Sequence, residues 1–246
     1  MKNPKVVIVM PAYNAARTIK DTYDEIPKQY RKSIILVDDF SKDNTVEVAK
    51  ALNIKVIAHK KNLGYGGNQK TCYNEALKMK ADIVVMLHPD YQYDGSLIGE
   101  LIEPIIQDRS DFMFGSRIKD RRGALLGGMP KHKYYINRIF CLIENILLGV
   151  NFTEHFSGYR AYSAKLLKVI PFKEFSDDFV FDQQMTIAAL KYNFRIGEIA
   201  IPTRYHLKAS SIGWIKGGKF LFQSLSSIFL YYYLDQLKLS ARSHSV

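Results

Sequence analysis

Short runs of β-branched and aliphatic residues alternate with segments of helical spacing over the first 90 residues of this 246-residue chain. The runs are too short for helices and are bounded by residues such as Pro, Asp and Asn, which is typical of buried parallel strands. We expect strands at 5–10, 33–37, 54–58 and 81–87, with helices at 15–30, 41–52 and 64–79 between them. Strands that alternate with helices build α/β proteins. The predicted fold is therefore a doubly wound, mostly parallel sheet flanked by helices.

Polar clusters stand where these expected strands end. They are Tyr13-Asn14, Asp38-Asp39, His88-Pro89-Asp90 and Ser116-Arg117. Ligands of open α/β sheets bind in the crevice beyond the carboxyl ends of the strands. The sequence therefore predicts a ligand site at this edge of the sheet.

The pattern changes after residue 117. We expect a basic, glycine-containing mobile loop at 119–130, a packed apolar helix at 134–148, a helix at 178–192, a strand at 194–201 and a final helix at 217–239. The sequence contains no repeat, low-complexity linker or second core. It indicates one domain at 1–212, completed by an apolar C-terminal helix and tail at 213–246 that belong to the same domain.

The formal net charge of +11 indicates an anionic partner. Nucleic acid, an anionic membrane surface and phosphorylated small molecules all satisfy it, but no aromatic-and-basic RNA-binding motif is present, so nucleic acid is not expected. Cys72 and Cys141 lack the spacing of a zinc site or a disulfide framework and are expected to be buried thiols. Residues 1–5 lack a signal-peptide pattern, which predicts a cytoplasmic location.

The segment 220–234 contains no charged residue. As a helix it would reach about 22 Å, short of the roughly 30 Å hydrocarbon layer of a bilayer. Flanking lysines and three consecutive tyrosines near one end are typical of a helix that lies in a membrane interface. A helix buried in the core or in a dimer contact explains the segment equally well. We expect a protein peripherally associated with the membrane, and the sequence leaves its oligomeric state open.

Two carboxylates and a glycine-rich turn at the predicted edge of the sheet are candidates for binding a ligand. Asp38 and Asp39 can accept hydrogen bonds from ring N–H groups or ribose hydroxyls, although one of them is equally suited to capping a helix near Ser41. Gly67 and Asn68 stand at a helix entrance that matches neither a dinucleotide fingerprint nor a P-loop. Free backbone N–H groups there can approach a ligand, and a tight turn alone would also need glycine.

Asp90 follows the fourth expected strand, with Gln92 and Asp94 nearby. Mg²⁺ and Mn²⁺ take oxygen ligands and commonly use one or two protein carboxylates beside substrate phosphates. Acidic turns also follow strands without binding any ligand. Spacing alone leaves a metal carboxylate and a solvated turn equally open.

Four motifs occur in order, namely PAYN at 11–14, VDDFSKDNT at 37–45, NLGYGGN at 62–68 and HPDYQYD at 88–94. Together they resemble the successive motifs of family-2 glycosyltransferases, particularly the branch of dolichol-phosphate mannose synthase and bacterial polyprenyl-phosphate glycosyltransferases. The stretch SGYRAY at 157–162 resembles that branch's acceptor-side loop. The stretches 179–184, 202–205 and 209–212 resemble the later motifs of the same branch.

This resemblance covers about residues 5–212 and implies a GT-A fold, an inverting transfer from a UDP- or GDP-sugar, and a Mn²⁺ or Mg²⁺ cofactor. Asp90 would bind the metal, and Asp182 would lie near the reacting sugar. The arginines that would face phosphates are Arg117, Arg160 and Arg204. Pro11, Tyr13 and Asp39 would hold the base and ribose. The full set expected to bind the nucleotide-sugar is Pro11, Tyr13, Asn14, Asp38, Asp39, Asn62, Gly64, Gly67, Asn68, His88 and Ser211.

One departure from the family's pattern concerns the metal. Its usual Asp-x-Asp motif has His88 at the first position here. Imidazole suits Mn²⁺ better than Mg²⁺, so His88 is a candidate ligand beside Asp90. Alternatively, His88 donates a hydrogen bond to the nucleotide and Asp90 is the single protein carboxylate.

The acceptor decides the role expected of Asp182. A hydroxyl of a glycan or protein needs a general base, for which Asp182 is the candidate. A polyprenyl phosphate is largely ionised at pH 7 and needs none, so Asp182 would orient the sugar. We expect the lipid phosphate, with the hydroxyl acceptor as the alternative and an inactive nucleotide- or nucleic-acid-binding module as a third hypothesis.

Overall fold

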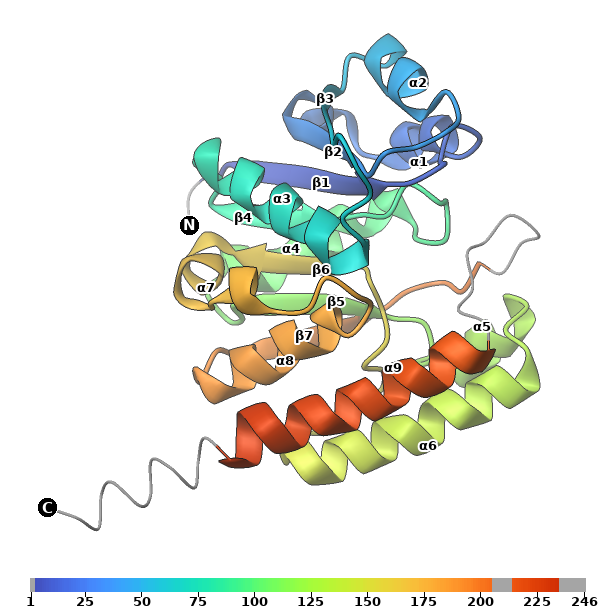
Figure 1. The fold of residues 1–246 in the computed structure, drawn as a ribbon, viewed down its shortest axis with the longest axis vertical. Coiled ribbons are helices and arrows are strands. Elements are labelled where there is room, and N and C mark those ends of the chain that lie inside the picture. Colours follow the sequence, from blue (N-terminus) through green and yellow to red (C-terminus); the bar gives the residue numbers. More distant parts are fainter. Residues whose placement is uncertain (1–2, 205–213, 235–246) are drawn as a thin grey trace, which may run out of the picture.

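A seven-stranded mixed sheet forms the centre of the molecule, and helices cover both of its faces (Figure 1). The structure is a computed structural model, which describes residues 3–204 and 214–234. The strand order is β3-β2-β1-β4-β6-β5-β7, and only β6 runs antiparallel to its neighbours. The prediction of a doubly wound, mostly parallel sheet is confirmed.

The four expected strands form one side of this sheet. They are β1 (Val6–Ala12), β2 (Ile34–Asp38), β3 (Lys55–Ala58) and β4 (Ile83–Met86). Side chains of a strand alternate between its faces. Ile8 and Met10 therefore join one hydrophobic core, whereas Val7 and Val9 join the other. Burial on both faces explains why β1, β2 and β4 are continuous apolar runs rather than alternating patterns, whereas β3 lies at the edge of the sheet and is partly exposed.

Three later strands complete the sheet: β5 (Phe112–Ser116), β6 (Arg160–Ser163) and β7 (Ile196–Ala200). The sequence did not indicate β6. This strand has four residues and begins with an arginine, so its local sequence carries little strand signal. Its extended conformation depends on antiparallel pairing with β4 on one side and β5 on the other.

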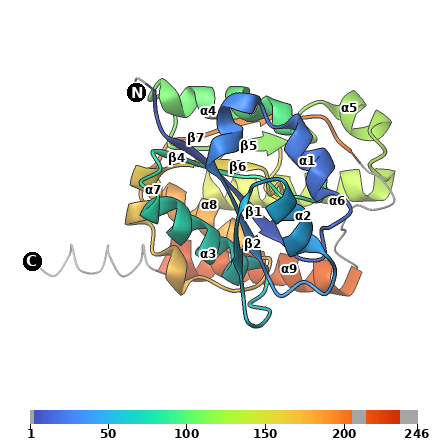
Figure 2. The ribbon, with the colours of Figure 1, turned by 90° about the horizontal axis from the view of Figure 1, so that it is seen from above.

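Helices cover the two faces of the sheet in separate groups (Figure 2). One group consists of α1 (Ile19–Glu25), α2 (Thr45–Ala51) and α4 (Ile98–Ile106). The other consists of α3 (Tyr65–Lys78), α7 (Ala164–Val169) and α8 (Phe181–Lys191). Cys72 and Cys141 are buried free thiols, as expected.

Two expectations about local structure were wrong. The segment predicted as a mobile loop at 119–130 contains a helix, α5 (Arg121–Leu126), whose first turn is capped by the Asp120 side chain. Ser41 does not begin a helix, because its hydroxyl accepts a hydrogen bond from the Asn14 backbone and α2 starts only at Thr45.

The remaining helices pack together beside the sheet. They are α6 (Lys131–Leu148) and α9 (Trp214–Ser227), which continues as a π-helical segment (Ile228–Leu234) (Figure 1). The expected helix at 217–239 is thus present up to residue 234, and its last five positions lie outside the described residues. Its composition is mixed rather than uniformly apolar. Within the described residues, no helix has both the length and the hydrophobicity that crossing a membrane requires.

Candidate active site

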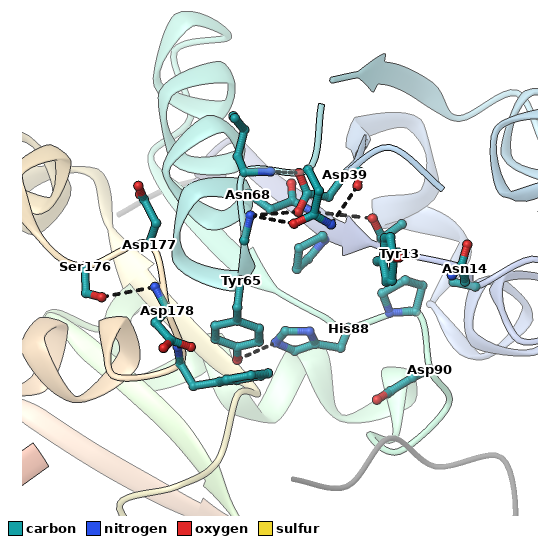
Figure 3. Close-up of a pocket in the computed structure, with 18 of the residues that line it drawn as sticks. Tyr13, Asn14, Asp39, Tyr65, Asn68, His88, Asp90, Ser176, Asp177 and Asp178 are labelled. Carbon is teal, nitrogen blue, oxygen red and sulfur yellow. Dashed lines mark hydrogen bonds between the residues drawn. The ribbon is translucent and has the colours of Figure 1, made fainter. Parts of the chain in front are cut away.

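A pocket of about 1130 Å³ opens beyond the carboxyl ends of β1, β2 and β4 (Figure 3). From β1 the chain turns toward β2 and β3, whereas β4 lies on its opposite side. This reversal of strand order is where open α/β sheets bind ligands. The walls come from 11–15, 17–18, Asp39, 62–65, Asn68, 88–90 and 176–179, and α9 adds Lys219 and Gln223.

The two adjacent aspartates at the end of β2 have different positions. Asp39 lines the pocket, and its carboxylate accepts hydrogen bonds from the backbone N–H groups of Leu63 at 2.8 Å and Gly64 at 3.0 Å. Asp39 therefore shapes the loop that begins at Asn62. Asp38 does not line the pocket, because its side chain is buried and accepts from the Ser41 backbone N–H at 3.1 Å. Asp38 thus stabilises the turn after β2, and its expected contact with the nucleotide stays a prediction.

The end of β1 supplies one pocket wall with Pro11, Tyr13 and Asn14. The Tyr13 side chain is 55% exposed, so its ring offers a flat apolar surface to a ligand. Asn14 has a positive φ of 52°, and its side-chain oxygen accepts from the Lys42 backbone. Asn68 is buried in the wall, where its amide donates to the Val37 carbonyl at 3.0 Å and holds α3 against β2.

The glycine-rich turn serves close packing more than ligand contact. Gly64 lines the pocket with a φ of 86°, which favours glycine. Gly67 does not line it, which departs from the expected role in binding the nucleotide. A Cβ at Gly67 would lie 2.9 Å from the Leu63 side chain, so the absence of a side chain there lets the turn fold tightly.

A hydrogen-bonded chain of three side chains runs inward from the pocket wall. The Tyr65 hydroxyl lies 3.2 Å from Nε2 of His88 and 2.7 Å from Oδ2 of Asp182 (Figure 3 shows the first contact). The other Asp182 oxygen accepts from the Gln69 amide at 3.0 Å. His88 lines the pocket, whereas Asp182 is 9% exposed and does not. Burial lowers the pKa of His88, against the opposing effect of Asp90 and Asp182.

The candidate metal ligands His88 and Asp90 both line the pocket. Asp90 follows β4, and the neighbouring Pro89 carbonyl accepts from the Thr18 hydroxyl at 2.5 Å, which ties this turn to α1. No group of three or more His, Cys, Asp or Glu side chains suited to a metal occurs among the described residues. One carboxylate and one imidazole fit a divalent cation that takes its other ligands from substrate phosphates and water.

None of the three arginines predicted to face phosphates lines the pocket. Arg160 is 2% exposed, and its guanidinium donates to carbonyls that include that of Asp182 at 2.7 Å. Arg117 forms an ion pair with the buried Glu154. Arg204 is held between Glu25 and Asp94, at 2.7 Å and 2.9 Å. In these positions carboxylates or carbonyls of the protein contact the guanidinium groups, and the expected phosphate contacts stay predictions.

Among the described residues, the cationic side chains that do line the pocket are Arg17 and Lys219. Neither was predicted as a site residue. Arg17 follows Tyr13 by four residues, and this position beyond β1 is the signal that could have found it. Lys219 is paired with Asp178 at 2.9 Å. Asp177 and Asp178, which the sequence suggested to be ordinary capping and surface residues, also line the pocket. Ser211 falls in 205–213, outside the described residues.

Comparisons with known proteins agree with this arrangement. Residues 7–170 match the model of the family described as glycosyl transferase family 2. The chain is 33% identical over 222 residues to the UDP-N-acetylglucosamine–dolichyl-phosphate N-acetylglucosaminyltransferase of Methanococcus voltae, covering 83% of this chain and 88% of that protein. It is 26% identical over 204 residues to the undecaprenyl-phosphate mannosyltransferase of Micrococcus luteus, with coverage of 80% and 82%.

Among solved structures, glucosyl-3-phosphoglycerate synthase from Mycobacterium tuberculosis, in complex with Mn²⁺, UDP and glucosyl-3-phosphoglycerate, superimposes with a TM-score of 0.70. The match covers 92% of this chain and 79% of that one, at 18% identity. At this identity the likeness establishes the fold, which is GT-A.

Proposed function

The chain belongs to glycosyltransferase family 2, and on this premise we propose that it transfers a sugar from a nucleotide-sugar to a polyprenyl phosphate at the cytoplasmic face of a membrane, with Mn²⁺ or Mg²⁺. The single observation that carries the proposal is the pocket at the reversal of strand order. Its lining combines the aromatic ring of Tyr13, the Asp90 carboxylate with the His88 imidazole, and the cationic side chains of Arg17 and Lys219. The names of two relatives specify dolichyl phosphate and undecaprenyl phosphate as acceptors.

The nucleoside half of the donor would bind between Tyr13 and the loop that Asp39 organises. Its diphosphate would then lie toward His88 and Asp90, with Arg17 and Lys219 at the pocket wall. A divalent cation bound by His88 and Asp90 would neutralise charge on the leaving diphosphate. Arg17 and Lys219 would add fixed positive charge, which stabilises the negative charge that develops as the glycosidic bond breaks.

The surroundings of Asp182 favour a phosphate acceptor over a hydroxyl. Both of its carboxylate oxygens accept hydrogen bonds, from Tyr65 and Gln69, and the side chain lies behind the pocket wall. A general base must reach the proton that it removes. In this arrangement Asp182 would orient Tyr65 in the pocket wall, and an ionised phosphate would attack without a base.

A membrane contact is supported by the outward faces of α6 and α9. In α6 the side chains of Ile139, Leu142 and Ile146 are 57%, 60% and 72% exposed. In α9, Ser224 and Ser227 point inward whereas Phe222 is 74% exposed, which inverts the usual arrangement in water. Exposed apolar area of this kind marks an interaction surface. Because α9 also lines the pocket, this surface adjoins the site, and we infer that the C-terminal helix is part of the catalytic domain.

The test is an assay with radiolabelled UDP- and GDP-sugars, polyprenyl phosphate in detergent and Mn²⁺ or Mg²⁺. We expect label from one donor to enter an organic-extractable lipid and to require the cation. Asp182→Asn should retain substantial transfer if the acceptor is a phosphate, and lose turnover if a hydroxyl is the acceptor. Failure of every donor to label lipid would overturn the proposal.

A further inference from the structure

We propose that Tyr65 is a positioning residue that fixes the Nε2–H tautomer of His88, so that Nδ1 presents its lone pair to the pocket as a ligand for a divalent cation beside Asp90. This inference refines the proposed function, since it assigns one atom of the metal site. It also decides between the two roles that the sequence left open for His88. A hydrogen bond donated from Nδ1 to the nucleotide is incompatible with this tautomer.

The argument begins with the single hydrogen of the Tyr65 hydroxyl. A carboxylate oxygen only accepts hydrogen bonds, so the 2.7 Å contact with Asp182 takes that hydrogen. The 3.2 Å contact with Nε2 of His88 must then be donated by the imidazole. A neutral imidazole carries one N–H, which leaves Nδ1 without a hydrogen.

Packing holds both rings in place. The Tyr65 ring lies parallel to that of His88, with centroids 5.4 Å apart, and rests against Phe179 at 4.7 Å. On the other side, a Cβ at Gly158 would lie 2.7 Å from Nε2 and 3.0 Å from Cδ2 of His88. The Nε2–Cδ2 edge is therefore enclosed by Gly158 and Tyr65.

Nδ1 stands on the opposite edge of the ring. No hydrogen bond to it occurs within 3–204 and 214–234, although His88 lines the pocket. A histidine that binds a metal commonly donates its other N–H to a neighbouring group, which sets the tautomer and the ring orientation. Here the Tyr65 hydroxyl is the group that accepts this hydrogen bond, and its own hydrogen bond to Asp182 orients it.

The first experiment measures the tautomer directly, in metal-free protein near pH 8 with ¹⁵N-labelled histidine. Two-bond ¹H–¹⁵N correlations distinguish a protonated from an unprotonated ring nitrogen, and His88→Gln identifies the signals of His88. We expect Nε2 protonated and Nδ1 unprotonated. An Nδ1–H tautomer, or averaging between the two, would overturn the inference. Because no sugar is transferred, this result is independent of whether the proposed function holds.

The second experiment compares Tyr65→Phe with Tyr73→Phe. Both remove a tyrosine hydroxyl from α3, but that of Tyr73, which is buried, donates to Gln69 and does not contact His88. Mn²⁺ binding, alone and with UDP, is followed by the electron paramagnetic resonance of free Mn²⁺. Tyr65→Phe should average the tautomers and raise the dissociation constant about 10-fold or more, whereas Tyr73→Phe should do neither. Equal effects of the two variants, or no Mn²⁺ binding by the unaltered protein, would overturn the inference.

Discussion

Arg17 illustrates how position, more than residue type, decides a role at the scale of single residues. It is exposed, lines the pocket, and has no hydrogen bond or ion pair within the described parts of the chain. Arg160 has the same guanidinium but is enclosed by carbonyl groups beneath the site. A phosphate can reach the first side chain and not the second.

We therefore expect Arg17→Ala to raise the KM for the nucleotide-sugar roughly 10-fold, since a charge-assisted contact to phosphate would be lost. The melting temperature should stay unchanged. Arg109→Ala is the matched control, because Arg109 is also exposed but precedes β5 at the opposite edge of the sheet. Steady-state kinetics with both variants checks this, and equal KM values for Arg17→Ala and the unaltered protein would contradict the role of Arg17.

Much of the pocket wall could be predicted from the sequence, because the position of a strand in the sheet fixes where the residues just after it lie. Tyr13 directly follows β1, His88 and Asp90 come shortly after β4, and all three line the pocket. The arginines could not be placed in this way. Whether Arg117 faces a ligand depends on Glu154, which is distant in sequence and forms an ion pair with it only in the folded chain.

At the scale of elements, a buried pair of ionisable groups lies where α6 meets α9. Glu144 of α6 bonds through Oε1 to the Ser224 hydroxyl of α9, and its Oε2 lies 3.4 Å from Nδ1 of His155. Nε2 of His155 donates to the Asn145 side-chain oxygen at 2.8 Å, so Nδ1 is an acceptor. A protonated Glu144 can donate a hydrogen bond to this Nδ1. Burial raises the pKa of Glu144 to about 7 and lowers that of His155 to about 4.

These shifts predict how stability depends on pH. A carboxyl with a raised pKa stabilises the fold fully below its ordinary value of 4.5, and this contribution is lost as the pH rises through about 7. The Glu144→Gln variant lacks this pH-dependent contribution. The free energy of unfolding of the variant minus that of the unaltered protein should therefore increase by about 2 to 3 kcal/mol between about pH 5 and about pH 8.

Urea unfolding of both proteins at the two pH values measures this difference. The opposing contribution of His155, lost as the pH falls from 6.5 toward about 4, is common to both proteins and cancels to a first approximation. Glu103→Gln, at an exposed position of α4, provides the control and should show no such trend. A pH-independent difference for Glu144→Gln would show that this carboxyl does not titrate in the fold.

Elements with a strong local pattern were predicted, and those that depend on neighbours were not. Strands β1, β2 and β4 come from continuous apolar runs that are too short for helices, a pattern that indicates buried strands. By contrast, β6 is extended only because it pairs with β4 and β5. Helix α6 was interpreted as packed because Arg138 and Glu144 interrupt its apolar run. The structure buries Glu144 and leaves an apolar row outside, an orientation that composition alone cannot reveal.

For the molecule as a whole, we propose that this apolar row, in a chain with a net charge of +11, contacts an anionic bilayer. Ile139, Leu142 and Ile146 recur at helical spacing along α6, and the exposed Arg121 and Arg122 lie in α5, which packs against α6. Partial burial of each apolar side chain in the interface contributes about 1 kcal/mol. Replacing all three with Gln should therefore weaken binding to vesicles containing anionic lipid on the order of 100-fold.

Vesicle sedimentation measures this binding, and the control replaces Val169 and Tyr192, which are exposed on other helices, with Gln. The control should bind as the unaltered protein does. Transfer to a short-chain, detergent-dispersed polyprenyl phosphate should persist in the α6 variant, since the pocket lies on other residues. Vesicle binding that survives the α6 substitutions would place the membrane contact elsewhere. Loss of transfer in detergent would instead mean that α6 contributes to the site itself, because a surface that serves only to dock the enzyme has no effect once the acceptor diffuses freely.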